Sequence, residues 1–145
     1  MTNIRQISAL ETYTVRHPVL RGGKTIESCQ FDGDELETTK HFGLFEENIL
    51  AGVISLFETK HEAFTAPEQT QIRGMAVLEK FQKRGFGALL VQHAEEYARS
   101  KQAELIWFNA RETAVGFYTK MGYSILGGPF DIANVGTHFI MHKTL

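Results

Sequence analysis

Alternating apolar and polar residues mark most of this chain as strand, with one long segment of helical spacing in its second half. Seven segments are expected as strands: 3–7, 41–46, 50–58, 69–78, 104–108, 123–126 and 137–143. From 88 to 100, apolar residues such as Leu90, Ala94 and Ala98 recur with polar residues between them, which predicts an amphipathic helix. A shorter helix is expected from 113 onward, ended by Gly122.

The segment that follows the first expected strand has its own start and stop signals. Ser8 and Glu11 have the spacing of a capping box and predict a helix there, which Pro18 should disturb. Residues 21–40 contain glycines and many charges, so a long loop or irregular arm is expected. A loop of that length in a compact domain is often functional.

The order of the expected elements predicts an α/β fold. A hairpin should turn at Glu47 and Asn48, and a strand, loop, helix and strand follow between 69 and 108. The last two strands should be separated by a loop that holds Pro129 and Gly136. One crossover unit among hairpins implies a mixed, largely antiparallel sheet.

Length and composition set the class of protein. A chain of 145 residues with 43% apolar and 22% charged residues is expected to form one globular domain, 1–145. A net charge of −2 gives no general electrostatic reason to bind nucleic acid or a membrane. The single cysteine, Cys29, suits a reducing compartment, and no leader or membrane span is expected, so the cytoplasm is the expected location. No set of metal ligands is expected.

A basic, glycine-bearing turn lies between the strand 69–78 and the long helix. It reads Gln82-Lys83-Arg84-Gly85-Phe86-Gly87. The first turn of a helix has backbone N–H groups without partners and a partial positive charge. Glycines let an anion approach that backbone, and Lys83 and Arg84 add full charges beside it. The turn therefore predicts a pyrophosphate site.

Two familiar phosphate loops do not fit this turn. A P-loop ends in Gly-Lys-Ser/Thr, and the chain has no such end here. A dinucleotide fingerprint has three glycines opening the first helix of its βαβ unit, whereas this turn has two and follows a strand deep in the chain.

The turn resembles the acetyl-CoA loop of the GNAT N-acetyltransferases, Gln/Arg-x-x-Gly-x-Gly/Ala, which Gln82, Gly85 and Gly87 match. Downstream, the strand 104–108 and Asn109-Ala110 lead to Phe117-Tyr118-x-x-x-Gly122-Tyr123, similar to a second block of that family. Two motifs in the right order are far more specific than one. The resemblance implies the GNAT fold, a mixed and mostly antiparallel sheet with splayed central strands flanked by helices.

The resemblance also implies acetyl-CoA as the bound cofactor, with CoA as product. Backbone N–H groups from Arg84 through Phe86 to Ala88 would hold the pyrophosphate, with Lys83 or Arg84 near the 3′-phosphate. The strand edge of Met75, Ala76 and Val77 would bind the pantetheine arm. A backbone N–H of Ala76 or Val77 is the expected oxyanion donor.

Two side chains of the second block have expected roles of their own. Asn109 would hydrogen-bond the pantetheine, or else simply end its strand. Tyr118 would assist the departing thiolate as a general acid, since a phenol has a pKa near 10 and a thiol one near 8.5. The alternative for Tyr118 is a half-buried aromatic that packs the helix on the sheet.

The general base stays open at this level. Many GNAT enzymes carry a glutamate on the strand before the phosphate loop, where this chain has Gln71 and Arg73. Five side chains, or water in their place, are alternatives: Glu58, Glu68, His17, His41 and His138.

Four arginines, Arg16, Arg21, Arg73 and Arg111, are expected to border one cleft. Arginine is a preferred partner of carboxylates and phosphates, so an acceptor with a carboxylate is one alternative; surface or cofactor-facing charges are the other. The segment 16–21, which includes His17, resembles one in small bacterial GNAT proteins and favours an acceptor site there.

The expected function is transfer of an acetyl group from acetyl-CoA to a primary amine, by direct attack in a ternary complex. The expected partner is a small-molecule amine, and a homodimer stays open. A non-catalytic acyl-CoA-binding sensor or interaction module on the same fold is the alternative, because the strand glutamate is missing.

Overall fold

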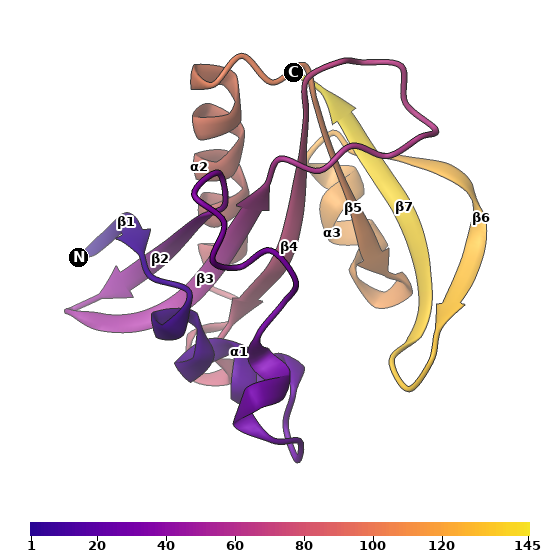
Figure 1. The fold of residues 1–145 in the computed structure, drawn as a ribbon. Coiled ribbons are helices and arrows are strands. Elements are labelled where there is room, and N and C mark those ends of the chain that lie inside the picture. The colour runs from indigo at the N-terminus through magenta and orange to yellow at the C-terminus, as the bar shows by residue number, and fades with distance from the viewer.

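One sheet runs through the molecule and carries helices on both faces (Figure 1). The computed structural model describes residues 1–145. The strands are β1 (Thr2–Ile7), β2 (Lys40–Glu46), β3 (Ile49–Phe57), β4 (Gln69–Val77), β5 (Leu105–Arg111), β6 (Ser124–Ile132) and β7 (Gly136–Thr144). The helices are α1 (Tyr13–Leu20), α2 (Phe86–Ser100) and α3 (Val115–Lys120).

The sheet is mixed, as the order of elements predicts. Its strands lie in the order β1-β2-β3-β4-β5-β7-β6, and every neighbouring pair is antiparallel except β4 and β5. Those two are parallel and are connected by α2. The predicted α/β class and the largely antiparallel sheet are confirmed.

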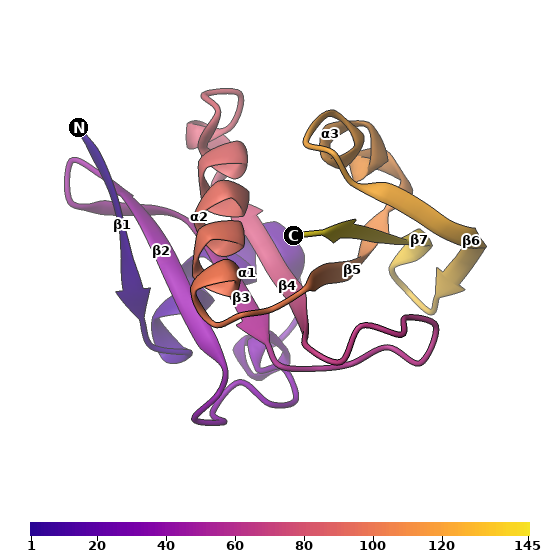
Figure 2. The same ribbon diagram turned by 90° about the horizontal axis from the view of Figure 1, so that it is seen from above.

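β4 and β5 touch over a short stretch and then separate. Only Gln69–Gln71 of β4 pair with Leu105–Trp107 of β5. Beyond these residues, the edge of β4 that faces β5 has no neighbouring strand, and the two halves of the sheet diverge (Figure 2). This splay leaves room for a ligand in the middle of the sheet.

Each face of the sheet has its own apolar layer. The larger core lies on the α2 and α3 face, where Leu90 and Val91 of α2 pack on Ile54 and Ile106 of the sheet. The smaller cluster lies under α1 and is built from Ile7, Val15, Phe45, Val53 and Ala76. None of the three helices combines the length and apolar character needed to cross a membrane.

The predicted capping box is present at the start of the first helical segment. Ser8 N–H donates to Glu11 Oε1 at 2.8 Å, and Glu11 N–H donates to Ser8 Oγ at 3.1 Å. The box opens a 3₁₀ turn, Leu10–Thr12, which continues directly into α1. Pro18 lies inside α1 and removes one backbone donor, and the helix ends two residues later at Leu20.

The predicted loop around Pro129 is wrong. β6 continues through Pro129 to Ile132, and the turn lies at Ala133–Val135. The pairing of β6 with β7 is irregular between Leu126 and Phe130, and β6 is the edge strand of the sheet. A proline without an N–H is accommodated at such an irregular edge, so Gly127-Gly128-Pro129 resembled a turn without being one.

Candidate functional site

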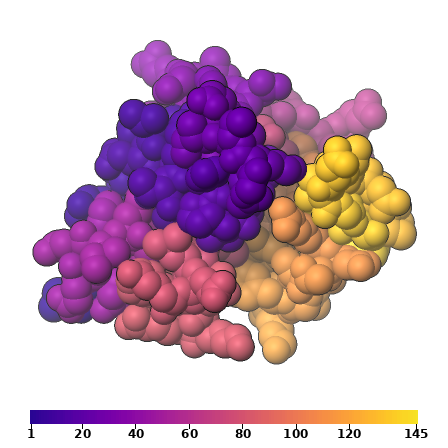
Figure 3. All heavy atoms as spheres, turned by 90° about the horizontal axis from the view of Figure 1, so that it is seen from below, coloured from indigo at the N-terminus to yellow at the C-terminus, as the bar shows by residue number.

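A cavity of about 420 Å³ opens where β4 and β5 separate. Figure 3 shows the face at which the arm 21–40, the loop before α2, the start of α3 and the β6–β7 hairpin meet around a hollow. The lining comprises Val19, Leu20, Arg21, Phe31, Gln71, Ile72, Arg73, Gly74, Met75, Phe108, Asn109, Ala110, Arg111, Thr113, Ala114, Tyr118, Ile132, Val135 and His138. Segments from both halves of the sheet therefore contribute to one pocket.

A bulge in β4 shapes the floor of the cavity. Val53 of β3 pairs with Ala76 and Ser55 pairs with Arg73, so Gly74 and Met75 together oppose the single residue between them. Gly74 has a φ of +67°, and a Cβ there would lie 2.8 Å from Phe31 Cε2. Both the backbone conformation and the close packing thus require glycine.

The bulge is followed by a free strand edge at Val77. The N–H of Leu78 donates to Ala51 O of β3 at 2.8 Å, so by alternation Val77 directs its N–H and C=O to the other edge. In agreement, Gln82 Nε2 donates to the Val77 carbonyl at 2.9 Å. The same alternation turns Ala76 toward β3. Of the two predicted oxyanion donors, the geometry favours Val77.

The loop before α2 turns its backbone toward the helix start. Lys83 and Gly85 both have left-handed backbones, with φ of +64° and +81°. A Cβ on Gly85 would meet no atom within 4 Å, so the space above the loop is open. Left-handed residues at a helix start gather N–H groups into an anion-binding concavity. The loop therefore suits a phosphate group.

The side chains of this loop have separate tasks. Phe86 is buried in the core, so only its backbone is available to a ligand. Gly87 and Ala88 continue the first turn of α2. Lys83 and Arg84 are exposed, and Arg84 Nη2 lies 3.5 Å from the carboxylate of the partly buried Glu46. Lys83 forms no ion pair, whereas Arg84 would have to leave Glu46 to pair with a phosphate.

Tyr118 of α3 is buried, with its ring centroid 4.4 Å from that of Phe108. Burial raises the pKa of the Tyr118 phenol to about 12. The Tyr118 hydroxyl has no hydrogen-bond partner in the protein. The only side-chain polar atom that is both fully buried and unpartnered is Arg16 Nε, so the Tyr118 hydroxyl must be at least partly accessible. Tyr118 is one of the residues that line the cavity, and its phenol stays protonated at physiological pH.

Three arginines line the cavity without any carboxylate among the lining residues. Arg111 is exposed at the end of β5, two residues after Asn109. Arg21 uses its Nε and Nη1 on the carbonyls of Ser28 and Leu20. The only polar contact of the Arg73 guanidinium is a long one, 3.4 Å from Nη1 to Asp32 O.

The Arg73 side chain is half-buried. Burial lowers its pKa from the ordinary value; Asp34 opposes this lowering and the neighbouring cation of Arg16 adds to it. Its Cζ lies 4.8 Å from the centroid of the Phe31 ring. A partly buried cation without a strong partner can stabilise an anionic ligand.

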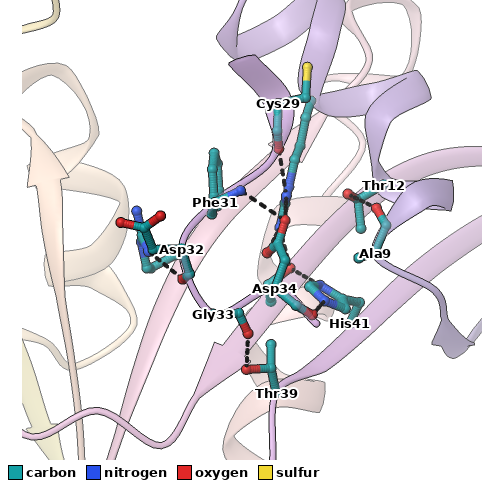
Figure 4. Close-up of polar contacts among 12 residues, drawn as sticks. Ala9, Thr12, Cys29, Phe31, Asp32, Gly33, Asp34, Thr39 and His41 are labelled. Carbon is teal, nitrogen blue, oxygen red and sulfur yellow. Dashed lines mark hydrogen bonds and ion pairs between the residues drawn. The ribbon is translucent and has the colours of Figure 1, made fainter. Parts of the chain in front are cut away.

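The expectation that Arg16 borders the cleft is wrong. Its side chain is fully buried, and Nη1 and Nη2 donate to the two carboxylate oxygens of Asp34 at 2.6 and 3.1 Å. Nη1 also donates to Cys29 O and Nη2 to Ser55 Oγ. Figure 4 shows Asp34 at the centre of this polar cluster. Arg16 therefore anchors the arm and does not line the cavity.

The same cluster fixes Phe31, which lines the cavity. Asp34 Oδ2 accepts a hydrogen bond from the Phe31 N–H at 2.9 Å, and the ring lies 3.9 Å from Arg16 Cζ (Figure 4). Sequence reasoning missed both Phe31 and Asp34. The acidic pattern Asp32-Gly33-Asp34 in the arm was the available signal, because a buried arginine needs such a partner.

The candidate bases are spread over the molecule, and only His138 lies in the cavity. His17 is also absent from the lining, and its Nε2 contacts Lys24 O at 2.7 Å, which corrects its expected place at the acceptor site. Both ring nitrogens of His41 are used within the polar cluster. Neither Glu58 nor Glu68 reaches the cavity.

Known proteins match this chain over most of its length. The model of the acetyltransferase (GNAT) family matches residues 6–123. The uncharacterised N-acetyltransferase YitI of Bacillus subtilis strain 168 is 35% identical over 145 residues, which cover 100% of this chain and 97% of YitI.

Solved structures share the fold. A candidate N-acetyltransferase from Lactobacillus plantarum superposes with a TM-score of 0.80 at 22% identity, covering 99% of this chain and 98% of that one. A GNAT family acetyltransferase from Elizabethkingia anophelis, with acetyl-CoA bound, gives a TM-score of 0.71 at 18% identity, with 99% and 98% covered.

Proposed function

This chain belongs to the GNAT acetyltransferase family, and on that premise we propose that it acetylates the primary amine of a small anionic acceptor, using acetyl-CoA. The observation that carries the anionic class is the cavity lining, which holds Arg21, Arg73 and Arg111 and no carboxylate. The chain as a whole is slightly acidic, with a net charge of −2. A local excess of cations in such a chain favours an anionic ligand.

The residues that fit acetyl-CoA follow the splayed edge of β4. The N–H groups at the start of α2 would hold the pyrophosphate, helped by Lys83 and Arg84. The free edge at Met75 and Val77 would bind the amide groups of the pantetheine arm, with Asn109 of β5 opposite. Open space at Gly85 and the unpaired edge of β4 are the features that support this placement.

Acetyl-CoA supplies the acetyl group as a thioester, whose thiolate the acceptor nitrogen displaces. The Val77 N–H would stabilise the negative charge that develops on the carbonyl oxygen. The Tyr118 hydroxyl would hydrogen-bond the departing sulfur. Full proton transfer from a phenol with a pKa of about 12 to a thiolate is uphill, because the conjugate thiol has a pKa near 8.5. We therefore assign Tyr118 the role of hydrogen-bond donor to the leaving group.

A thiol-release assay with matched acceptors tests this function. The acids are L-glutamate, 4-aminobutyrate and 2-aminoethylphosphonate, and each is paired with a counterpart that lacks its acidic groups: glutamic diamide, n-butylamine and ethanolamine. We expect at least one anionic amine to exceed its counterpart by about 10- to 150-fold in kcat/KM, as the loss of a charge-assisted hydrogen bond implies.

Two outcomes would contradict the proposal. Equal rates on the members of every pair would remove the anionic class. Calorimetric binding of acetyl-CoA without turnover on any acceptor would favour the non-catalytic acyl-CoA-binding module instead.

A further inference from the structure

The cavity contains one side chain able to accept a proton from the acceptor, the imidazole of His138. The other polar and titratable groups of the lining are three arginines, the Tyr118 phenol, Thr113 and the amides of Gln71 and Asn109. Arginine stays protonated, and amides and hydroxyls are very weak bases. The strand glutamate that many relatives are expected to use is replaced by Gln71 and Arg73.

The hydrogen bonding of His138 fixes its tautomer. Nδ1 lies 2.8 Å from the carbonyl oxygen of Gly136. A carbonyl only accepts, so Nδ1 carries the proton, and in the neutral imidazole Nε2 has the free lone pair. The hydrogen bond to Gly136, at the start of β7, therefore leaves Nε2 available as a proton acceptor.

Nε2 is accessible although the residue is 4% exposed. Nε2 has no hydrogen-bond partner within the protein. If it were also fully buried, it would be a second atom of the kind that Arg16 Nε alone represents in this protein. The His138 Nε2 is therefore open to solvent. His138 is one of the residues that line the cavity.

The charged groups that share the cavity lining with His138 are cations. Arg111 is its direct cross-strand partner on β5, and Arg73 and Arg21 belong to the same lining. On the β6 side, the Phe130 ring lies 6.0 Å from the imidazole, and Asp131 accepts a hydrogen bond from the Thr137 hydroxyl on the exposed surface. The Tyr118 phenol is neutral at physiological pH. No carboxylate lines the cavity.

We propose that His138 is the general base that takes the proton from the acceptor nitrogen, an inference that rests on the proposed acetyl transfer. As the neutral amine attacks, an N–C bond forms and the C–S bond breaks. One N–H proton passes to His138 Nε2, and the thiolate leaves toward the Tyr118 hydroxyl. The imidazolium then returns its proton, directly or through water, so that the thiol forms and the base is regenerated without net proton uptake. If the cavity arginines bind the acid group of the acceptor, they would hold its amine within reach of Nε2.

The test compares His138→Gln and His138→Ala with the wild type across pH 5.5 to 9. The acceptor is whichever of L-glutamate, 4-aminobutyrate and 2-aminoethylphosphonate the wild type acetylates fastest. We expect kcat/KM to fall by about 10²- to 10⁴-fold, with loss of one limb of the pH profile. Added imidazole should partly restore His138→Ala and should not affect His138→Gln, in which the space is filled. Acetyl-CoA affinity, measured by calorimetry, should stay within about twofold.

His142→Gln is the matched control, because His142 lies on the same strand and outside the cavity lining. It should retain wild-type kcat/KM and the complete pH profile. A His138→Gln enzyme with wild-type activity, or a loss that imidazole fails to restore in His138→Ala, would overturn the assignment. A wild type that acetylates none of the three acceptors would overturn the proposed function, and that result appears before any variant is made.

Discussion

Two arginines, Arg16 and Arg73, lie close to the Phe31 ring and differ in what each guanidinium faces. Arg16 is fully buried and forms a bidentate pair with Asp34, so its charge is neutralised within the fold. Arg73 also packs against Phe31, but it faces a cavity whose lining has no carboxylate. An arginine in a sequence thus indicates an anion site only when no acid of the same chain lies beside it. The charge of Arg16 is paired within the protein, whereas Arg73 has no acid beside it in the cavity lining.

The largest expected effect comes from breaking the buried pair. Arg16→Met would leave the Asp34 carboxylate buried without its partner, and we expect a loss of about 3–5 kcal/mol in the free energy of unfolding. Urea denaturation measures it. The double variant Arg16→Met/Asp34→Leu removes both charges and should recover most of the loss. If the single variant were as stable as the wild type, Arg16 would not anchor the arm.

Tyr118→Phe tests a neutral residue of the cavity that Arg73 lines, because it removes only the Tyr118 hydroxyl. Because the variant keeps the ring, packing should be retained, while kcat should fall by roughly 10²-fold with acceptor KM little changed. Steady-state kinetics on an anionic amine measures both constants. An unchanged kcat would mean that Tyr118 serves only to pack α3 on the sheet.

The burial of Tyr118 also predicts a pH dependence of stability. Its pKa is about 12 in the folded protein against 10 in the unfolded chain, so the unfolded state loses this proton first. The contribution is fully present below pH 10 and is lost as the pH rises from 10 to 12, by up to about 2.7 kcal/mol. Denaturation of the wild type and Tyr118→Phe at pH 9 to 11.5 measures the difference. Parallel curves would show that the phenol is well hydrated.

Arg73→Met should have the smallest effect on stability. In contrast to Arg16→Met, it should mainly affect activity. Removing a half-buried cation that has no acid partner should change the free energy of unfolding by less than about 1 kcal/mol. The same variant should lower kcat/KM for an anionic amine by about 10- to 150-fold and leave the neutral counterpart nearly unaffected. If Arg73→Met destabilised the protein as much as Arg16→Met, the two environments would not differ as described.

Local patterns predicted most of the fold. The long helix, the hairpin at Glu47–Asn48 and the strand before the phosphate loop depend on residues close in sequence, and all three are present. The second half of β6 was missed because Gly127-Gly128-Pro129 has the composition of a turn. Its pairing partners lie on β7, and only the formed sheet reveals that an edge irregularity accommodates the proline.

The positions of some site residues were predicted correctly and those of others were not, depending on whether their partners lie near them in the sequence. The glycine turn and Tyr118 belong to contiguous motifs, and their local geometry follows from the neighbouring residues. The fate of each arginine depends on distant partners: Asp34 is 18 positions from Arg16 in the chain, and nothing near Arg16 indicates it. Likewise, His138 differs from His17 in lining the cavity, and from His41 also in having a ring nitrogen without a partner.

The brief contact between β4 and β5 has a consequence for how the molecule opens. Three residues of each strand hold the two halves of the sheet together, although the apolar layer under α2 continues across both. Local unfolding that separates β5, β6 and β7 from the rest therefore breaks few backbone hydrogen bonds. A ligand that binds the free edges of both β4 and β5 would connect the two halves of the sheet. The free energy of partial opening would then rise as more of the protein is bound to ligand. Cooperativity of unfolding in this protein would then be a property of the complex more than of the chain alone.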